Sequence, residues 1–427
     1  MSNKILQNSG WFILSILSLI PAVIWMFSSP YFSIRSFGDV AGLCGMAMFS
    51  LVMILSARLK FFEKFFKGIN ESYTAHHFFG GLAFVLLLFH PLFLAYNYLL
   101  VSFNEAALFL LPGQSWPKNF GILGLFVMIV TLVITFYTKL KYQVWKFTHK
   151  FLGIAFIFAF LHTFFIGADI ATNQVLKIYL FVLGILAIIT YFYRTLFADY
   201  FVRVFEYIVK DVNQNKDNIW EIELTPRKKE IKFVPGQFGF VKFFSKELGK
   251  EPHPFSFSSA GGNPLKIAVK ELGDYTGKIG NLKLGDLVAV EGPFGAFSLK
   301  NHSNKKQVWI AGGVGVTPFL SMLRSVTEKD SDYKIYLYYS VKNENSLAFR
   351  EEISEITQKY KNLKVNFWVT EERGFLTAKA VKEEILDLEE RDVLICGPSL
   401  MMSALEKQLI DQGVNGKKIH MEEFTLY

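Results

Sequence analysis

Cysteines, low-complexity tracts and long runs of one charge are scarce in this sequence, and each scarcity narrows what the chain can be. Only two of its 427 residues are cysteines, Cys44 in an apolar stretch and Cys396 far along a part of mixed polarity. A structural disulfide is therefore not expected, and the mixed part is expected in the cytoplasm. Lys and Arg outnumber Asp and Glu by 45 to 37. These basic residues gather at the ends of apolar stretches, which predicts no nucleic-acid partner.

Long uncharged runs predict a membrane domain in the first half of the chain. Hydrophobic residues make up 52% of the sequence, and about 20 apolar residues suffice to cross the hydrocarbon core as a helix. We expect the first run to remain as an anchored helix rather than a cleaved signal. Six spans are predicted, at residues 11–34, 40–57, 73–98, 120–137, 147–167 and 178–193.

The loops between these spans predict the orientation of the chain. Loop 58–72 and link 138–150 each carry four Lys or Arg residues, whereas the opposite loops offer one apiece. The excess of positive charge on cytoplasmic loops predicts that both termini lie in the cytoplasm. The chain is thus expected in the cell membrane, with lipid as a partner.

Four of the eight histidines lie at matching depths in two of the spans. His76 and His90 are 14 residues apart, and His149 and His162 are 13 apart, which separates each pair by roughly 20 Å along a helix. Because one span lies between these helices, they run parallel, so we expect His76 level with His149 and His90 level with His162. Two bis-imidazole sites stacked across the bilayer follow, and this ligand set suits haem iron.

Two details of this ligand set stay open. His77 is an alternative to His76, although His76 and His149 are each followed by a glycine four residues on, Gly80 and Gly153. A spacing of 14 returns two side chains to nearly the same face of a helix, whereas a spacing of 13 does not. The second helix must therefore tighten locally or present its ligands from different azimuths.

The second half of the chain carries two successive patterns. Residues 200–300 alternate in short strands separated by turns, which is typical of a small antiparallel barrel. From about Lys305 strands alternate with helices, the signature of a parallel sheet with crossover helices. The predicted domains are 1–197, 198–302 and 303–427.

Two turns predict a nucleotide site in the last domain. Residues 312–318, Gly-Gly-Val-Gly-Val-Thr-Pro, lie between a predicted strand and a predicted helix. Glycines there let the backbone approach a pyrophosphate, and free amides at the helix start favour its charge. Residues 396–398, Cys-Gly-Pro, follow a later strand, and ligands of parallel sheets bind at such carboxyl ends. The predicted nucleotide-binding residues are Gly312, Gly313, Gly315, Thr317, Pro318, Cys396, Gly397 and Pro398.

Two earlier segments predict a flavin site. Residues 253–259, His-Pro-Phe-Ser-Phe-Ser-Ser, combine aromatic rings able to stack on a flat ring with hydroxyls able to bond its heteroatoms. Residues 273–278, Gly-Asp-Tyr-Thr-Gly-Lys, offer small residues and amides for a phosphate group. A flavin also explains the order of the parts, because it accepts a two-electron hydride and passes on single electrons.

Taken in order, the histidine spacings and these four motifs resemble the ferric reductase and NADPH oxidase superfamily over the whole chain, especially its bacterial NADPH oxidase homologues. The resemblance implies a membrane all-α six-helix dihaem bundle fused to a ferredoxin-reductase-like module. That module is implied to hold an antiparallel β-barrel FAD domain and an α/β parallel-sheet nucleotide domain. FAD, two b-type haems, and NADPH or NADH as electron donor are the implied cofactors.

The resemblance also implies roles for single residues. Phe255 is expected to stack near the flavin, with Ser256 near its reactive nitrogen and His253 in the place of an arginine of soluble relatives. The ending Glu422-Glu423-Phe424 resembles the family's acidic-x-aromatic terminus, so Phe424, or alternatively Tyr427, is expected to cover the flavin until nicotinamide displaces it. The expected FAD-binding residues are His253, Pro254, Phe255, Ser256, Ser259, Thr276, Gly277 and Phe424, and the expected catalytic residues are Ser256, Cys396, Glu422 and Phe424.

The electron acceptor and the nucleotide stay open at this point. Bis-histidine ligation leaves the iron no free position, which suits oxygen reduced to superoxide at the haem edge but equally suits a ferric chelate. A cytochrome that serves an outside protein partner is a third hypothesis, although the attached dehydrogenase module argues against an obligatory one. Lys342 follows the second strand of the nucleotide domain, and no acidic residue ends that strand, which favours NADPH or dual use.

Overall fold

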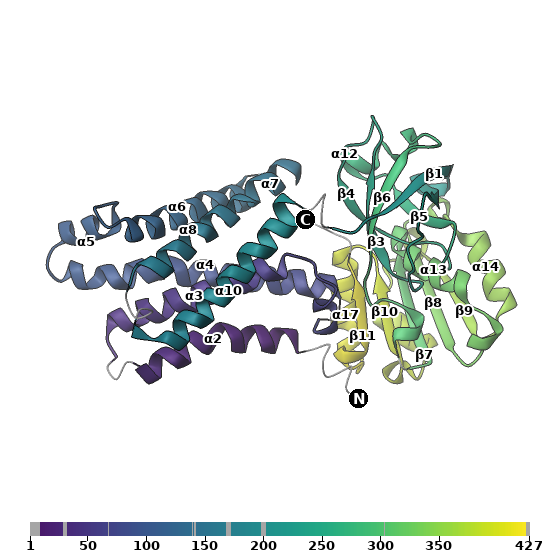
Figure 1. Cartoon of the computed structure of the whole chain (residues 1–427). Coiled ribbons are helices and arrows are strands. Elements are labelled where there is room, and N and C mark those ends of the chain that lie inside the picture. The colour runs from purple at the N-terminus through teal and green to yellow at the C-terminus, as the bar shows by residue number, and fades with distance from the viewer. Residues whose placement is uncertain are drawn as a thin grey trace. The chain divides into compact units, whose positions relative to one another are not determined.

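The computed structural model forms two compact units, Met1–Val202 and Arg203–Tyr427, and each is described by itself. The first is a helical bundle and the second is built on two β-sheets (Figure 1). The structure describes residues 9–28, 32–66, 68–138, 140, 142–167, 172–197, 202–302 and 304–423.

Within the described part of the first unit, six helical segments are long and apolar enough to cross a membrane, which confirms the predicted number of spans. A short helix, α5 (Phe103–Leu110), connects the third and fourth. The six segments are α2 (Gly10–Ser28), α3 (Ile34–Leu55), α4 (Ile69–Leu99), α6 (Trp116–Tyr137), α7 with α8 (Tyr142–His149 and Phe151–Phe165) and α10 (Gln174–Tyr191).

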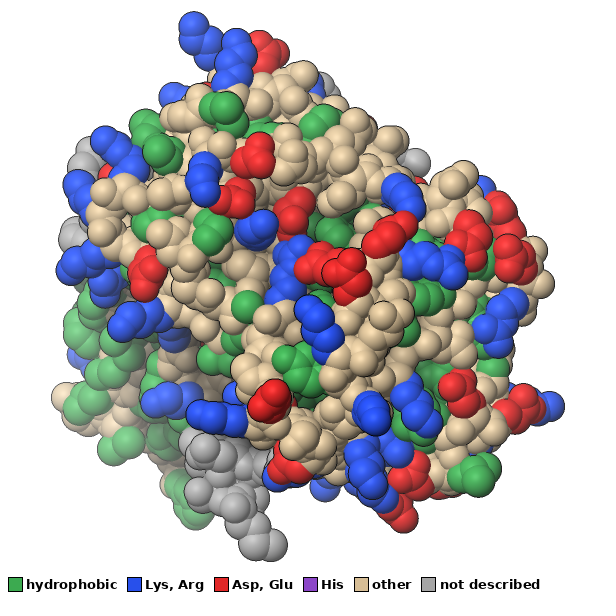
Figure 2. All heavy atoms as spheres, turned by 90° about the vertical axis from the view of Figure 1, so that its right-hand side faces the viewer, with side chains coloured by type: hydrophobic (Ala, Val, Ile, Leu, Met, Phe, Trp, Pro, Cys, Tyr) green, Lys and Arg blue, Asp and Glu red, His purple; other side chains and the backbone are tan. Residues whose placement is uncertain are grey.

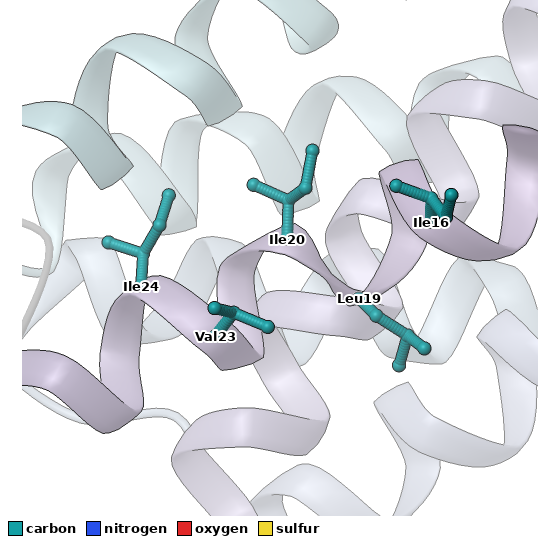
Figure 3. Close-up of a pocket in the computed structure, with 5 residues that line it drawn as sticks. All are labelled: Ile16, Leu19, Ile20, Val23 and Ile24. Atoms are coloured by element: carbon teal, nitrogen blue, oxygen red, sulfur yellow. The ribbon is translucent and has the colours of Figure 1, made fainter.

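Helix α3 is the enclosed member of the bundle. Most of its residues after Ala41 are buried, whereas the other spanning helices expose large apolar side chains such as Phe126 and Phe136 of α6. A shallow pocket on α2 is lined only by aliphatic side chains, Ile16, Leu19, Ile20, Val23 and Ile24 (Figure 3). Exposed apolar surface of this kind suits lipid chains, since it offers no polar group for chemistry.

The first sheet of the second unit has six antiparallel strands in the order β4-β3-β6-β1-β2-β5. Its edges meet, because Phe257 after β4 forms a bridge with Ile267 of β5 and the Ser258 N–H donates to the Lys266 carbonyl at 2.7 Å. The sheet therefore curls around its own apolar core, as predicted for a small barrel. The strands are β1 (Phe205–Gln214), β2 (Ile219–Pro226), β3 (Phe238–Phe243), β4 (Pro252–Ser256), β5 (Leu265–Lys270) and β6 (Leu287–Phe294).

The second sheet has five parallel strands in the order β11-β10-β7-β8-β9. Side chains alternate along β7, so Trp309 packs on the face under α13 while Val308 and Ile310 pack on the face under α16 and α17. Helices on both faces confirm the predicted parallel sheet with crossovers. The strands are β7 (Lys306–Gly312), β8 (Lys334–Val341), β9 (Leu363–Val369), β10 (Asp392–Cys396) and β11 (Ile419–Glu422), and the helices are α13 (Thr317–Ser325), α14 (Arg350–Lys359), α15 (Thr370–Arg373), α16 (Ala378–Glu384) and α17 (Ser399–Asp411).

The surface of the second unit carries both signs of charge. On the face in Figure 2, Lys and Arg side chains are interspersed with Asp and Glu side chains. Exposed ion pairs such as Lys216 with Glu351 at 2.9 Å and Lys306 with Glu390 at 2.7 Å account for part of this mixture. Such pairs contribute little stability individually.

Candidate functional site

Two of the histidines predicted as a pair face each other between α4 and α8. The ring centroids of His90 and His162 lie 6.3 Å apart. Nδ1 of His90 lies 2.8 Å from the carbonyl of Gly38 on α3, and Nδ1 of His162 lies 2.8 Å from the carbonyl of Pro117 on α6. Because a carbonyl can only accept, each Nδ1 carries the proton and each Nε2 keeps a lone pair, as in metal-bound histidines.

The second predicted pair also comes together, although its two rings are held differently. The centroids of His76 on α4 and His149 at the end of α7 lie 6.5 Å apart. Nδ1 of His76 lies 3.1 Å from the Val52 carbonyl. The buried Nδ1 of His149 has no hydrogen-bond partner among the described residues, and its ring instead stacks on Trp145 at 5.3 Å.

Both pairs have the spacing that a shared iron requires. A metal–imidazole bond is about 2 Å long and the ring centre lies about 1.1 Å beyond the nitrogen, so two rings on opposite sides of one metal have centroids about 6 Å apart. The observed 6.3 and 6.5 Å agree with this value. The residues present therefore fit two six-coordinate haems with histidine on both sides.

His77, the alternative to His76, points elsewhere. Its side chain is exposed, whereas that of His76 is half-buried. One helical residue turns the side chain by about 100°, and the two rings accordingly meet edge-on with centroids 5.7 Å apart. The geometry favours His76 as the member of the pair with His149.

The helix that carries His149 and His162 is broken between them. Helix α7 ends at His149 and α8 begins at Phe151. The Lys150 N–H donates to Phe147 and the Gly153 N–H donates to Lys150, each a three-residue turn. The chain thus tightens locally, which is one of the two arrangements expected for a spacing of 13.

A tyrosine of α10 supports this break. The Tyr191 hydroxyl donates to the Lys150 carbonyl at 3.1 Å. Its ring fills the space beside Gly153, where a Cβ atom would lie 2.1 Å from it. The glycine shared by the two histidine helices is therefore needed at this position for close packing.

Sequence reasoning missed the glycines that pack against the rings of His90 and His162. A Cβ on Gly42 of α3 would lie 2.5 Å from Nδ1 of His90, and one on Gly121 of α6 would lie 2.8 Å from Nδ1 of His162. Gly42 follows Gly38 by four residues and Gly121 follows Pro117 by four, so each pair lies on one helix face. On that face the first residue contacts the imidazole with its carbonyl, and the glycine one turn later leaves room for the ring because it has no side chain. A pair of small residues in each span, Gly42 with Gly45 and Gly121 with Gly124, is the signal that was available.

The two turns predicted to bind a nucleotide lie side by side at the carboxyl ends of β7 and β10. Ala311 pairs with Cys396 in register, and a Cβ on Gly315 would lie 2.3 Å from the Cys396 carbonyl. Only glycine permits this approach. Gly313 has a φ of +54° and open space beside it, so part of the turn is free to meet a ligand, while Thr317 is buried and its hydroxyl donates to the Val314 carbonyl at 2.7 Å.

Cys396 and Glu422 are neighbours in this sheet. They pair in register on β10 and β11, and both are buried. Burial raises the pKa of the Cys396 thiol well above 9.0, and the Glu422 carboxylate raises it further. Phe424 and Tyr427, the expected flavin covers, lie outside the described residues.

The two segments predicted to bind a flavin contact each other. The His253 ring on β4 lies against the Tyr275 ring of the short helix α12 (Gly273–Thr276), with the centroids 3.8 Å apart and the planes tilted by 30°. Ser256 is buried at the end of β4, and Phe255 is half-buried. The Thr276 hydroxyl donates to the Leu272 carbonyl at 2.6 Å and accepts from the Leu272 N–H at 2.8 Å, so it holds its own loop closed. The remaining expected residues, Pro254, Ser259 and Gly277, lie on these same two segments.

Helix α13 joins the nucleotide domain to the barrel, a link that sequence reasoning also missed. The Ser321 hydroxyl donates to the Ser259 carbonyl at 2.6 Å. Arg324 donates to the Ser258 carbonyl at 2.9 Å and to Glu221 of β2 at 2.6 Å, and its other edge binds Glu352 of α14. The predicted flavin segment is thereby fixed to the helix that follows the predicted nucleotide turn.

Lys342 follows β8, at the same edge of the sheet as the glycine-rich turn. Its side chain is exposed, and its Nζ lies 3.8 Å from the Glu371 carboxylate of α15. A lysine so placed is accessible to a charged group of a bound nucleotide.

Three family models match the chain in succession. Residues 41–160 match the ferric reductase like transmembrane component, residues 204–317 match an FAD-binding domain, and residues 309–407 match the oxidoreductase NAD-binding domain.

This chain matches curated relatives over only part of their length. Flavohemoprotein B of Dictyostelium discoideum is 33% identical over 153 residues, which cover 34% of this chain and 36% of the relative. A flavohemoprotein of Bacillus cereus is 31% identical over 244 residues, which cover 51% of this chain and 60% of the relative. The chain thus spans between about a third and three fifths of the length of these relatives.

Among solved structures, the flavohem-like FAD/NAD binding domain of nitric oxide dioxygenase from Vibrio cholerae is 22% identical, with a TM-score of 0.43, over 51% of this chain and 97% of that one. The three family matches, in this order and on a chain with six candidate spans, carry the assignment. The protein belongs to the ferric reductase and NADPH oxidase superfamily and joins an integral membrane domain to a ferredoxin-reductase-like FAD and NAD module.

Proposed function

We propose that this protein passes electrons from NAD(P)H in the cytoplasm, by way of FAD and two bis-histidine b-type haems, to oxygen on the outer face, where superoxide forms. The observation that carries this proposal is that α4, α7 and α8 hold two pairs of histidines whose rings face each other, in a chain that also has a reductase module. NAD(P)H-driven electron transfer by a membrane oxidoreductase is the part that the family matches support directly.

The protein's own residues would position the cofactors. When bound, FAD accepts a two-electron hydride and releases single electrons, which haem iron accepts one at a time. The carbonyls of Gly38, Pro117 and Val52 contact Nδ1 of three imidazoles, so Nε2 of each would be free to hold haem iron. With both termini in the cytoplasm, His76 and His149 form the inner site, and His90 and His162 form the outer one.

The ligand set also shapes the choice of acceptor. Protein imidazoles on both sides of each iron would leave no free coordination position. An acceptor must then take its electron at the edge of the outer haem, and oxygen needs no binding pocket for this. A ferric chelate or a protein partner would need a recognition surface, and we propose no obligatory partner.

The reductase module supplies the donor side of this proposal. The turns at 312–318 and 396–398 would hold the nicotinamide nucleotide, with Lys342 available to a 2′-phosphate. The segments at 253–259 and 273–278 would hold FAD, with Ser256 near its reactive nitrogen. The Cys396 thiol stays protonated near neutral pH because burial raises its pKa, so its role would be to pack against the nicotinamide rather than to attack it.

Oxygen-dependent turnover tests the proposal. Detergent-purified protein loaded with haem and FAD would be given NADPH and then NADH, with a superoxide-specific trap. We expect nucleotide oxidation with superoxide release, lost in His90→Ala and His162→Ala and retained in His77→Ala. Reduced haem that persists in air and is reoxidised only by a ferric chelate or a protein would contradict the oxidase function. It would leave the electron-transfer function in place.

A further inference from the structure

Three side chains outside the sites described above meet in the second unit. His302 follows the turn Leu299–Asn301, which leads from the barrel into β7, while Asp392 begins β10 and His420 lies in β11. One ligating atom from each residue lies within 4.8 Å of the other two. The two imidazole rings are 4.0 Å apart between centroids, with an angle of 38° between their planes.

Sheet register explains why two of the three come together. Asp392 and Leu394 are two residues apart on β10, so their side chains leave the same face of the sheet. Leu394 pairs with His420 on the neighbouring strand β11, which places Asp392 diagonally beside His420 on that face. His302 lies at the same face because Leu299, three residues before it, packs in one buried cluster with Leu394.

The cluster offers a donor set that suits a metal cation. Asp392 is only 4% exposed, and a ligating atom of its carboxylate lies within 4.8 Å of one on each imidazole. Two imidazoles and one carboxylate together form a donor set that divalent transition metals prefer.

We propose that His302, Asp392 and His420 bind one divalent transition-metal ion, with Zn²⁺ as the representative. In a tetrahedral zinc site with bonds of 2.0–2.1 Å, ligand atoms lie about 3.4 Å apart. Closing the cluster from its present spacing requires movements of about 1 Å, and one coordination position remains for water. The ion ties together the segment that leaves the barrel, strand β10 and the edge strand β11. Its role is therefore structural, and it fixes the strand that ends at Glu422.

Metal counting on the full chain tests this site. Tag-free protein, loaded with haem and FAD so that the other histidines are occupied, would be stripped with EDTA and dialysed against micromolar Zn²⁺. We expect about one zinc per FAD by mass spectrometry in the wild type, and more than tenfold weaker binding in Asp392→Asn and His420→Gln, because even partners of metal ligands contribute 10- to 100-fold. Glu383→Gln removes an exposed carboxylate of α16 and is the matched control, which should bind zinc like the wild type.

Thermal unfolding gives a second readout that does not depend on activity. Zinc should raise the unfolding temperature of the wild type and of Glu383→Gln, and this rise should be absent in Asp392→Asn and His420→Gln. Each variant is compared with itself with and without zinc, so a general loss of stability does not imitate the result. Wild-type protein that binds no zinc under these conditions, or variants that bind and respond like the wild type, would overturn the proposal.

Discussion

On the proposed function, replacing Gly42 by alanine should empty the haem site at His90 and His162 while leaving the site at His76 and His149 filled. The added methyl group would lie 2.5 Å from Nδ1 and 2.8 Å from Cε1 of His90. Favourable contacts between such atoms lie at about 3.5–4.0 Å, so the imidazole must move by roughly 1 Å. The movement would disturb the 2.8 Å hydrogen bond from Nδ1 of His90 to the Gly38 carbonyl. It would also change the 6.3 Å separation between the ring centroids of His90 and His162.

The expected loss of haem affinity can be judged from the contacts that hold His90 in place. Loss of a hydrogen-bonding partner behind a metal-bound histidine costs about 10- to 100-fold in metal affinity, and here the ring itself is displaced as well. The haem content should fall from two per FAD to about one, measured as the pyridine haemochrome against released flavin. Gly121→Ala, with its methyl group 2.8 Å from Nδ1 of His162, should act in the same way.

Two glycines of α4 provide matched controls. A methyl group on Gly81 meets nothing within 4 Å, and one on Gly80 comes no closer than 3.6 Å to Val52. Alanine in a helix interior is favoured over glycine by up to about 1 kcal/mol, so Gly81→Ala should keep both haems and at least wild-type stability. Two haems in Gly42→Ala, with spectra and reduction potentials like those of Gly81→Ala, would refute the argument that contact with the glycine positions the ligand.

Three further predictions concern the reductase module. Arg324→Met removes the cation that bonds both Glu221 and Glu352 and should lower the free energy of unfolding by about 3 kcal/mol, seen as earlier release of flavin fluorescence on heating. Lys216→Ala at an exposed pair should change it by less than about 1 kcal/mol. Lys342→Ala should raise the KM for NADPH a few-fold, as an exposed charge contact of at most about 1 kcal/mol allows, and leave the KM for NADH unchanged; equal changes for both would contradict a contact with the 2′-phosphate. Because burial raises the pKa of Cys396, its thiolate should become available only as the pH rises above 9. Native protein at pH 8 should therefore react with iodoacetamide far more slowly at Cys396 than unfolded protein, as followed by peptide mass spectrometry.

Features that depend on local pattern could be predicted from the sequence. The six spans follow from uncharged runs of sufficient length, and the levels of the four histidines follow from helical rise and the parallel course of two helices. The glycine-rich turn at 312–318 was recognisable because glycine, strand and helix adjoin in the chain. In each case the prediction rests on the pattern within a segment and on the order of neighbouring segments along the chain.

Features that depend on which elements pack together could not be predicted. The contact between Gly42 and His90 requires that α3 lie against α4 with that face turned inward. Arg324 meets Glu221 across 103 residues. His302 and His420 are 118 residues apart and adjoin only because β10 lies between β7 and the edge strand β11. Strand order and helix contacts arise from the whole fold and leave no local pattern.

The carbonyls that orient His90 and His162 belong to helices that carry neither histidine pair. Gly38 and Pro117 lie near the starts of α3 and α6, each opposite the far end of the helix that bears the histidine. The position of this histidine pair along the bundle is therefore set by where two neighbouring helices begin. A change in the loop before α3 or α6 that shifts the start of either helix by one residue would move an anchoring carbonyl by about 1.5 Å. On the proposed function, the distance between the haem at this pair and the acceptor would thus be controlled from outside the helices that carry the histidines.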